Sequence, residues 1–279
     1  MEHFEQRTAV ITGGAGGIGL ATAERLGREG MNLVIADIEE RVLVSEVARL
    51  CADGFRAIGI VTDTADHDSV KALAARAADE FGDVHLLFNN AGVGGGGPML
   101  EPDDLELWHW TLGVNLYGVV DGIKAFGPAM VAHGQPYHIV NTASMAGLLP
   151  TSGLGVYTAS KFAVVALSES LALETADTNL GVSVLCPGFV RTGIADSDRN
   201  LPEHLAARRE EPTAEQEMMR AAVRDLVAGG IAPTAVAEHI VEAVRHDRFY
   251  ILPHPHYGAQ VAARGVRIAS GDAPTSWSI

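Results

Sequence analysis

Short runs of apolar residues alternate with longer amphipathic stretches along most of the chain. The short runs are rich in Val, Ile and Leu, which is typical of strands buried on both faces of a parallel sheet. They predict strands at 8–11, 32–36, 56–61, 85–88, 138–141 and 182–186. The longer stretches predict helices at 21–29, 41–52, 69–81 and 103–131, the last bent at Gly113 or Gly118, and a further helix that opens near Val156.

This order of elements predicts an α/β fold: a single Rossmann-like, doubly wound parallel sheet of about seven strands, with helices on both faces. We expect one dinucleotide-binding catalytic domain over residues 1–279. Residues 193–232 are polar and charged, with helical patches but no strand. They predict a lid over a ligand site or, as the alternative, a surface insert without ligand contact. The C-terminal extension at 253–279 contains prolines and predicts little regular structure.

The composition narrows the classes of partner. The chain has 20 basic and 35 acidic residues, a net charge of −15, and no basic run, so nucleic acid is not an expected partner. No apolar stretch approaches the length of a membrane span, and the N-terminal residues lack a signal pattern, so we expect no membrane contact and a cytoplasmic location. Cys51 and Cys186 are expected to be buried free thiols, with a disulfide as the less favoured alternative.

A glycine-rich segment, TGGAGGIG at residues 12–19, follows the first predicted strand. Glycine lets the backbone approach a pyrophosphate, and the N-terminus of the next helix offers free N–H groups. Asp37 ends the second strand, where a carboxylate accepts hydrogen bonds from both ribose hydroxyls and repels a 2′-phosphate. We therefore expect NAD rather than NADP. The alternative for the glycine-rich segment is a purely structural turn. The expected contacts are Gly13, Gly16, Gly17, Ile18, Gly19 and Asp37.

Two further strand ends face the same expected site. Asp63 and Thr64 follow the third strand, where the Asp63 carboxylate would reach the adenine amino group or, alternatively, cap the next helix. The sequence NNAG at 89–92 ends the fourth strand, and its small residues would lie flat against a cofactor. Asn90, Ala91 and Gly92 are therefore candidate cofactor contacts, with hydrogen bonds to neighbouring loops as the competing role of the asparagines.

Tyr157 and Lys161 stand one helical turn apart at the start of an apolar helix. An ammonium on the same helix face stabilises a phenolate and lowers the tyrosine pKa, so that the hydroxyl can exchange a proton with an alcohol or a carbonyl. Ser144 can hydrogen-bond the same substrate oxygen, and Asn115 on the long helix can hold a water near Lys161. Each has a plain alternative: Ser144 as a helix cap, Asn115 as a buried amide and Tyr157 as a core residue.

These motifs together resemble the short-chain dehydrogenases/reductases. The resemblance is carried by TGGAGGIG, Asp37, NNAG, Asn115, Ser144, the YTASK run and PGFVRT, in the family's order, over about residues 5–252. It implies that Tyr157 is the catalytic acid/base and that Ser144 positions the substrate oxygen. It also implies that Lys161 binds the nicotinamide ribose and lowers the pKa of Tyr157, with Asn115 completing a proton relay.

The resemblance adds residues and an assembly that the motifs alone do not give. It implies that Pro187, Gly188, Val190 and Thr192 hold the nicotinamide end of the cofactor. It also implies a homo-oligomer, a tetramer or a dimer. The expected activity is hydride transfer between NAD and a secondary alcohol or ketone. The alternatives are an NAD-using epimerase or dehydratase, and a non-catalytic dinucleotide-sensing protein on the same fold.

The sequence is less informative about the substrate pocket than about the cofactor site. The apolar segment 145–155 and the glycine-rich loop 92–99 predict a roomy, largely apolar pocket under a mobile lid. Met145, Leu148 and Leu149 are the candidate pocket walls beside Ser144 and Tyr157, with core packing as their competing use. No metal is expected: His254 and His256 flank a proline without a nearby cysteine or acid.

Overall fold

The computed structural model describes residues 1, 3–97, 99–100, 105–208 and 212–275. Seven parallel strands form one sheet in the order β3-β2-β1-β4-β5-β6-β7. They are β1 (Thr8–Thr12), β2 (Asn32–Asp37), β3 (Ala57–Val61), β4 (Leu86–Asn89), β5 (Tyr137–Thr142), β6 (Leu180–Leu185) and β7 (Tyr250–Ile251). The predicted fold class is confirmed. Of these strands, the apolar pattern missed only β7, which has two residues.

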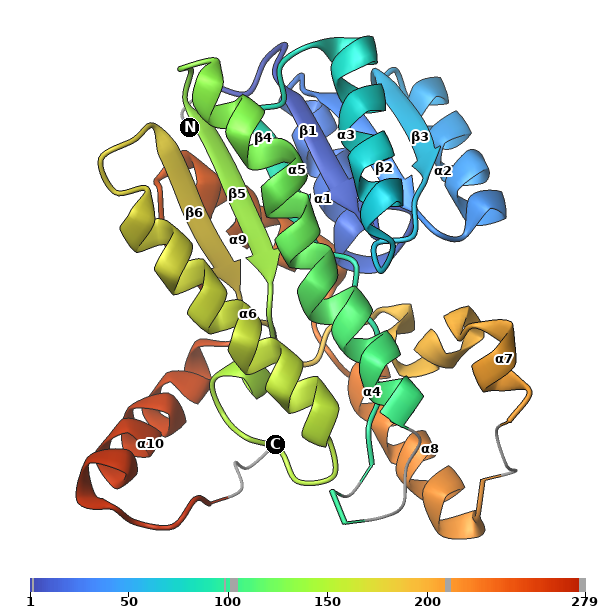
Figure 1. Cartoon of the computed structure of the whole chain (residues 1–279), viewed down its shortest axis with the longest axis vertical. Helices are drawn as coiled ribbons and strands as arrows, with labels where there is room; N and C mark the ends of the chain where they lie inside the picture. Colours follow the sequence, from blue (N-terminus) through green and yellow to red (C-terminus); the bar gives the residue numbers. More distant parts are fainter. Residues whose placement is uncertain (2, 98, 101–104, 209–211, 276–279) are drawn as a thin grey trace.

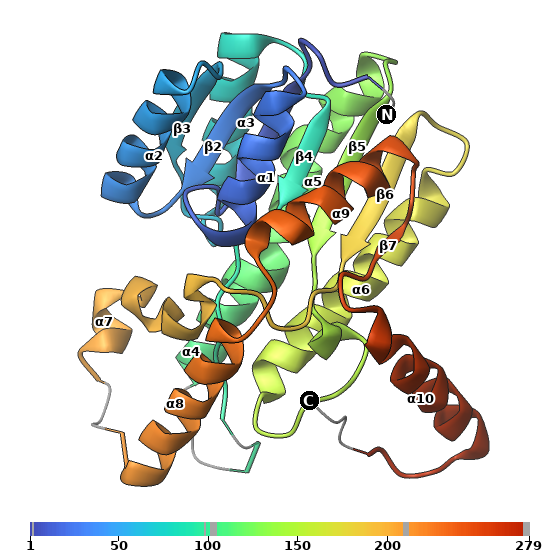
Figure 2. The same cartoon turned by 180° about the vertical axis from the view of Figure 1, so that it is seen from behind.

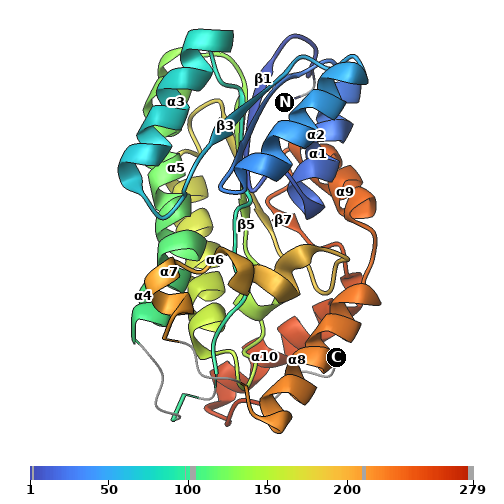
Figure 3. The same cartoon turned by 90° about the vertical axis from the view of Figure 1, so that its right-hand side faces the viewer.

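Helices cover both faces of the sheet (Figures 1 and 3). On one face lie α1 (Gly17–Arg28), α2 (Glu40–Ala52) and α9 (Pro233–Arg245); on the other lie α3 (His67–Phe81), α5 (Gly118–Ala132) and α6 (Gly155–Glu174). Successive strand residues enter opposite cores: Leu33 packs into the cluster under α1 and α9, and Val34 into the cluster with Leu73 of α3. Both faces are buried, which explains the continuous apolar runs in the sequence.

The strand order reverses between β1 and β4. From β1 the chain winds outward to β2 and β3, and it then returns to β4 on the opposite side of β1. The loops after these two strands diverge at their carboxyl ends, and this divergence forms the crevice in which open α/β sheets bind ligands. Residues 12–17 and 89–92 form those loops, so the topology brings the two glycine-containing motifs together.

The long helix predicted at 103–131 is interrupted. It consists of α4 (Leu105–Leu112), a π-helical turn (Gly113–Tyr117) and α5; residues 103 and 104 lie outside the described residues. The Gly118 N–H donates to the Gly113 carbonyl oxygen, which is the wide-turn bond that defines the interruption. It lies between the two glycines at which a bend was expected, and it carries the buried Asn115.

The segment that follows β6 is helical, as predicted. It contains a 3₁₀ segment η3 (Gly193–Asn200), α7 (Glu203–Ala206) and α8 (Ala214–Ala228), all beyond the carboxyl ends of the strands (Figures 1 and 2). The prediction of little regular structure after residue 253 is wrong. The extension forms a 3₁₀ turn η4 (Pro255–Tyr257) and the helix α10 (Gly258–Ser270). Its prolines lie before and after α10, so they do not interrupt the helix.

Three smaller expectations also fail. Helix α1 begins at Gly17, four residues before the predicted start at 21, because the glycine turn runs directly into the helix. Cys51 is exposed, since α2 buries Leu43 and Leu50 and the next residue points away from that face; Cys186 is buried. The third is the expectation that no apolar stretch approaches the length of a membrane span. Among the described helices, α6 is long and apolar enough by composition to span a bilayer, with mean hydropathy 1.2, although it also buries Lys161 against the sheet.

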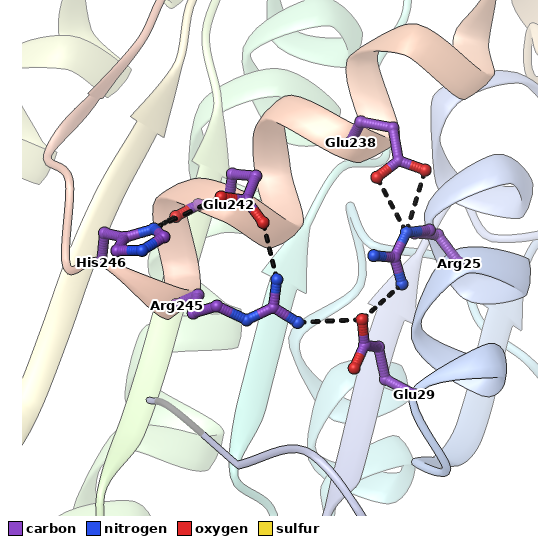
Figure 4. Close-up of polar contacts among 6 residues, drawn as sticks. All are labelled: Arg25, Glu29, Glu238, Glu242, Arg245 and His246. Atoms are coloured by element: carbon purple, nitrogen blue, oxygen red, sulfur yellow. Dashed lines mark hydrogen bonds and ion pairs between the residues drawn. The ribbon is translucent and has the colours of Figure 1, made fainter.

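Ionic contacts join α1 to α9 (Figure 4). The α1–α9 clamp comprises Arg25, Glu29, Glu238, Glu242, Arg245 and His246. Arg25 Nε lies 2.9 Å from both carboxylate oxygens of Glu238, and Arg25 Nη1 lies 2.7 Å from Glu29. Arg245 contacts Glu29 at 2.9 Å and Glu242 at 2.6 Å. These contacts lie over an apolar interface in which Leu26 and Ile240 are fully buried.

Candidate active site

The glycine turn after β1 is built from glycines with different uses. A Cβ on Gly13 would lie 2.8 Å from Ala91 Cα, and one on Gly19 would lie 2.2 Å from the Gly13 carbonyl oxygen. Gly17 has φ +53°, and a Cβ there would press on Thr192. Gly16 differs, because the space beside it is open and it stands just before α1, at the N-cap position, without a side chain to cap the helix. The open side of the turn therefore exposes a helix N-terminus suited to a pyrophosphate.

Polar groups from two strand ends hold this turn. Asp37 accepts the Ala15 N–H at 3.0 Å on Oδ2 and the Glu39 N–H at 3.1 Å on Oδ1. Asn90 Nδ2 donates to the carbonyl oxygens of Thr12 and Gly13, at 3.0 and 3.1 Å. The hydrogen bonds to neighbouring loops that were the competing role for Asn90 are therefore present, and they shape the crevice.

The remaining candidates at the adenine side lie on the next loop. Asp63 is exposed and accepts the Ala65 N–H at 2.9 Å, while Thr64 is buried. Asp66 caps α3 by accepting the Asp68 N–H. The alternative that Asp63 caps this helix is therefore wrong, because the helix begins three residues later than a cap at Asp63 requires.

Ser144, Tyr157 and Lys161 meet at the carboxyl ends of β5 and β6. The Ser144 side chain is close enough to Tyr157 to lower the pKa of its hydroxyl. It accepts the Ala146 N–H at 3.1 Å, so it caps the short turn η2 (Met145–Gly147) as the structural alternative predicted. Lys161 is 3 % exposed. Its Nζ donates to the Thr142 carbonyl oxygen at 3.0 Å and lies 5.7 Å from the centre of the Tyr157 ring.

Asn115 ties the π-helical turn to the loop after β4. Its Oδ1 accepts the Val93 N–H at 2.8 Å, and its Nδ2 donates to the Val93 carbonyl oxygen at 3.0 Å and to Ser160 Oγ at 3.2 Å. A Cβ on Gly92 would lie 3.3 Å from Asn115 Oδ1 and 3.5 Å from Lys161 Nζ. Gly92 thus keeps a space beside both polar groups. Ser160 is a member of this network that the sequence motifs did not reveal.

The pKa shift of Tyr157 beside Lys161 differs from the one that the sequence predicts. Burial raises the pKa of Tyr157, and the nearby Ser144 side chain only partly opposes this. Burial also lowers the pKa of Lys161 to about 8. The expected fall in the tyrosine pKa is therefore wrong for the chain by itself, because loss of hydration at the phenolate outweighs an ammonium that is several ångströms away and itself poorly hydrated.

The PGFVRT segment lies across the crevice from the glycine turn. The Pro187 carbonyl oxygen accepts the Met145 N–H at 2.8 Å, and the Gly188 N–H donates to His254 Nδ1 at 3.0 Å. Val190 is buried and forms a parallel bridge with Ile231. Thr192 caps η3 and faces Gly17. A cavity of about 830 Å³ is lined by Gly17, Thr192 and residues of α8. Its lining does not include Ser144 or Tyr157.

The start of the 193–232 segment is attached to both sides of the crevice. Ser197 Oγ accepts the Gly94 N–H at 2.8 Å. Arg199 Nη2 lies 2.7 Å from Glu39 Oε1, and Asn200 Nδ2 donates to the same oxygen at 3.2 Å. These contacts hold the pKa of Glu39 below its usual value, chiefly through Arg199. The segment thus spans from the loop after β2 to the loop after β4.

Two of the three predicted pocket walls are core residues, and the third, Leu148, is partly buried against the same cluster. Met145 and Leu149 are 1 % and 2 % exposed and pack with Val164, Val184 and Cys186. Leu149 also borders a cavity of about 270 Å³ between the η2 loop and α10, lined by Pro150, Arg264, Arg267 and Ile268 among others. Core packing, the competing use of all three residues, is therefore present, and their contact with substrate stays a prediction.

A family model for short chain dehydrogenases matches residues 7–202. The chain belongs to the short-chain dehydrogenase/reductase family. The crystal structure of a short-chain dehydrogenase/reductase from Burkholderia phymatum in complex with NAD is 44 % identical, covers all of both chains and has a TM-score of 0.95. The C alpha-dehydrogenase of a Sphingobium species is 35 % identical over 91 % of this chain and 83 % of its own length.

A second curated relative is the 1-deoxy-11-beta-hydroxypentalenate dehydrogenase of Streptomyces arenae, which is 36 % identical over 90 % of this chain and 83 % of its own length. With the family match, these relatives show that the chain is a short-chain dehydrogenase acting on CH–OH groups, a class that uses NAD(P). The expected family, fold and enzyme class are confirmed.

Proposed function

We propose that this short-chain dehydrogenase uses NAD to interconvert a secondary alcohol of largely apolar character and its ketone. The observation that carries the proposal is that Ser144, Tyr157 and the buried Lys161 meet at the carboxyl ends of β5 and β6, with Ser144 close enough to Tyr157 to lower its pKa. This arrangement lies beside the crevice formed by the loops after β1 and β4, where the fold binds a dinucleotide.

The residue roles follow from this geometry. The substrate oxygen would lie between the two hydroxyls, with Ser144 fixing its position and Tyr157 exchanging the proton. Bound NAD would supply the acceptor for the substrate hydride. Lys161 would bind the nicotinamide ribose, and Asn115 would hold the Val93 backbone beside it. Because burial raises the pKa of Tyr157, the phenol predominates at neutral pH. We therefore expect alcohol oxidation to accelerate as the pH rises.

The residues present fit NAD better than NADP. Asp37 ends β2 with each carboxylate oxygen already oriented by a backbone N–H, and Glu39 and Glu40 follow it. The guanidinium of Arg199 at this loop is paired with Glu39. A 2′-phosphate there would meet the fixed Asp37 carboxylate. The NAD complex of the Burkholderia phymatum protein supports the same choice.

An apolar substrate is proposed from the surroundings of the two hydroxyls. The residues that follow Ser144 are apolar: Met145 and Ala146 belong to η2, and Leu148 and Leu149 follow that turn. The two curated relatives are a C alpha-dehydrogenase and a 1-deoxy-11-beta-hydroxypentalenate dehydrogenase, which also supports an alcohol on a carbon framework. We further propose a homo-oligomer, because α4, the π-helical turn, α5 and α6 expose the large apolar side chains Leu105, Tyr117, Val131 and Leu173. Light scattering after gel filtration tests that assembly.

A panel of secondary alcohols tests the function, with NADH formation followed at 340 nm and NADP as the parallel cofactor. We expect turnover with apolar alcohols, a preference for NAD, and relaxed discrimination in Asp37→Ala. Glu40→Ala is the matched control, since it removes an exposed carboxylate from the neighbouring helix start. Tight NAD binding without turnover of any alcohol or ketone would contradict the dehydrogenase proposal in favour of an epimerase, dehydratase or sensor. An unchanged cofactor ratio in Asp37→Ala would contradict the ribose assignment.

A further inference from the structure

His254 lies in the C-terminal extension but packs against the PGFVRT segment. It precedes the η4 turn and is 8 % exposed. Its Nδ1 accepts the Gly188 N–H at 3.0 Å, and its Nε2 lies 3.2 Å from the Phe189 carbonyl oxygen. Both ring nitrogens are therefore engaged by adjacent backbone groups, which leaves neither for a metal.

These contacts define the state of the ring. Nδ1 must be unprotonated to accept the Gly188 N–H, so the ring proton is on Nε2 and is donated to Phe189. Burial lowers the pKa of His254 and outweighs the hydrogen bond to the Phe189 carbonyl oxygen, which raises it; the neighbouring His256 and His239 also lower it. The neutral form, with one acceptor and one donor, is thus the form present at neutral pH.

The packing at Gly188 has no spare room. A Cβ on Gly188 would lie 3.0 Å from Tyr257 Cε2 and 3.2 Å from His254 Cγ. On the other side, the preceding residue Pro187 accepts the Met145 N–H at 2.8 Å. The backbone at 187–189 is therefore held between the turn that follows Ser144 and two aromatic rings of the C-terminal extension.

We propose that His254 is a positioning residue for the nicotinamide end of the cofactor, acting through the Gly188 and Phe189 backbone. This inference rests on the proposed function and on the expectation from the family resemblance that Pro187, Gly188, Val190 and Thr192 hold that end. It gives the C-terminal extension a part in cofactor binding. It also explains the HPH sequence without a metal: the first histidine binds the loop, and the second is exposed and packs on Tyr257 at 4.1 Å between ring centres.

The test compares two probes that share the adenosine and pyrophosphate but differ in the nicotinamide. Dissociation constants for NAD⁺ and ADP-ribose are measured by calorimetry on the full chain, for the wild type and three variants. His254→Phe keeps a ring but loses both hydrogen bonds, and we expect NAD⁺ to bind roughly three- to tenfold more weakly while ADP-ribose changes little. His254→Asn places an amide oxygen near the position of Nδ1, so it should recover part of the loss. His256→Phe, the matched control, should leave both constants unchanged.

The outcomes separate this inference from the proposed function. If His254→Phe weakens both probes equally, or neither, the positioning role is wrong although NAD binding stands. If His256→Phe reproduces the selective loss, the effect belongs to the aromatic cluster and the assignment to His254 is overturned. If the wild type binds neither probe, the proposed cofactor is wrong and this inference is refuted with it.

Discussion

The two ends of the sheet both place a serine near a basic side chain, but the serine has a different role at each end. Toward the amino ends of β5 and β6, Ser183 Oγ lies 2.7 Å from His138 Nε2, and Asp247 Oδ1 lies 3.8 Å from His138 Nδ1. This outline resembles a Ser–His–Asp relay. At the carboxyl ends, Ser144 lies close to Tyr157 above Lys161.

The difference lies in where the hydroxyl protons go. Ser183 is fully buried and donates to the Arg248 carbonyl oxygen at 2.8 Å, so it accepts from His138 and has no proton to exchange with a substrate. Tyr157 and Ser144 are only partly buried and lie close together beside the ligand crevice. Residue types in proximity are therefore not enough to define a catalytic site. The comparison predicts that substitutions at the carboxyl end reduce activity without reducing stability. Substitutions at the amino end should reduce stability without reducing activity.

The largest effect is expected for Tyr157→Phe. Removing the hydroxyl deletes the proposed proton-exchanging group, so kcat/KM should fall by about 10³-fold, within the usual range for general acid–base catalysis. The free energy of unfolding and the dissociation constant of NAD⁺ should change little, because the ring stays in place. Steady-state kinetics, urea denaturation and calorimetry measure the three quantities. Retained turnover would show that another group exchanges the proton.

The converse effect is expected for Ser183→Ala. This change leaves the buried His138 Nε2–H and the Arg248 carbonyl oxygen without their shared partner, at a cost of about 1–3 kcal/mol in the free energy of unfolding. Activity per folded molecule should be unchanged. Ser270→Ala is the matched control, because Ser270 is exposed and bonds only within α10. Loss of turnover at full stability in Ser183→Ala would break the distinction between the two ends.

The sequence predicts most of the fold because its signals are local. Each of the six longer strands lies within two residues of its predicted position, since apolar runs and the breaks after them are properties of neighbouring residues. The strand β7 has two residues and no pattern of its own, and α10 follows prolines that favour irregular structure. The π-helical turn falls between the two glycines that predict a bend.

The sequence predicts the residues of the candidate site but not all of their interactions. The motifs locate Asn115, Ser144, Tyr157 and Lys161, because the chemistry requires those residue types. They do not give the direction of the tyrosine pKa, which depends on how much water the fold removes from the phenol. They also give no sign that His254 bonds Gly188, since the two residues are 66 positions apart and meet only when β6 and β7 pair.

Acid should weaken the amino end first. Burial lowers the pKa of His138 to about 3 in the folded chain, from 6.5. Between pH 3 and pH 6.5 His138 is protonated in the unfolded chain but neutral in the folded chain. Its contribution to the free energy of unfolding is therefore complete above pH 6.5 and is lost as the pH falls toward 3. The slope from this group is at most about 1.4 kcal/mol per pH unit. Urea denaturation from pH 7.5 to 4.5 measures it. His138→Gln should flatten part of the slope, and an unchanged slope would assign the acid sensitivity to other groups.

The smallest effect is expected at the α1–α9 clamp, which lies outside both ends (Figure 4). Helix α1 begins at the glycine turn, so the clamp could act on the cofactor site or only on the packing of the two helices. Glu238 is 59 % exposed, and water screens its pair with Arg25. The coupling energy from a double-mutant cycle of Arg25→Ala and Glu238→Ala should therefore be below about 1 kcal/mol and should shrink in high salt. NAD⁺ affinity should be unchanged in all three variants, because Leu26 and Ile240 keep the helices packed. A weakened NAD⁺ affinity would instead make the clamp part of the carboxyl-end site.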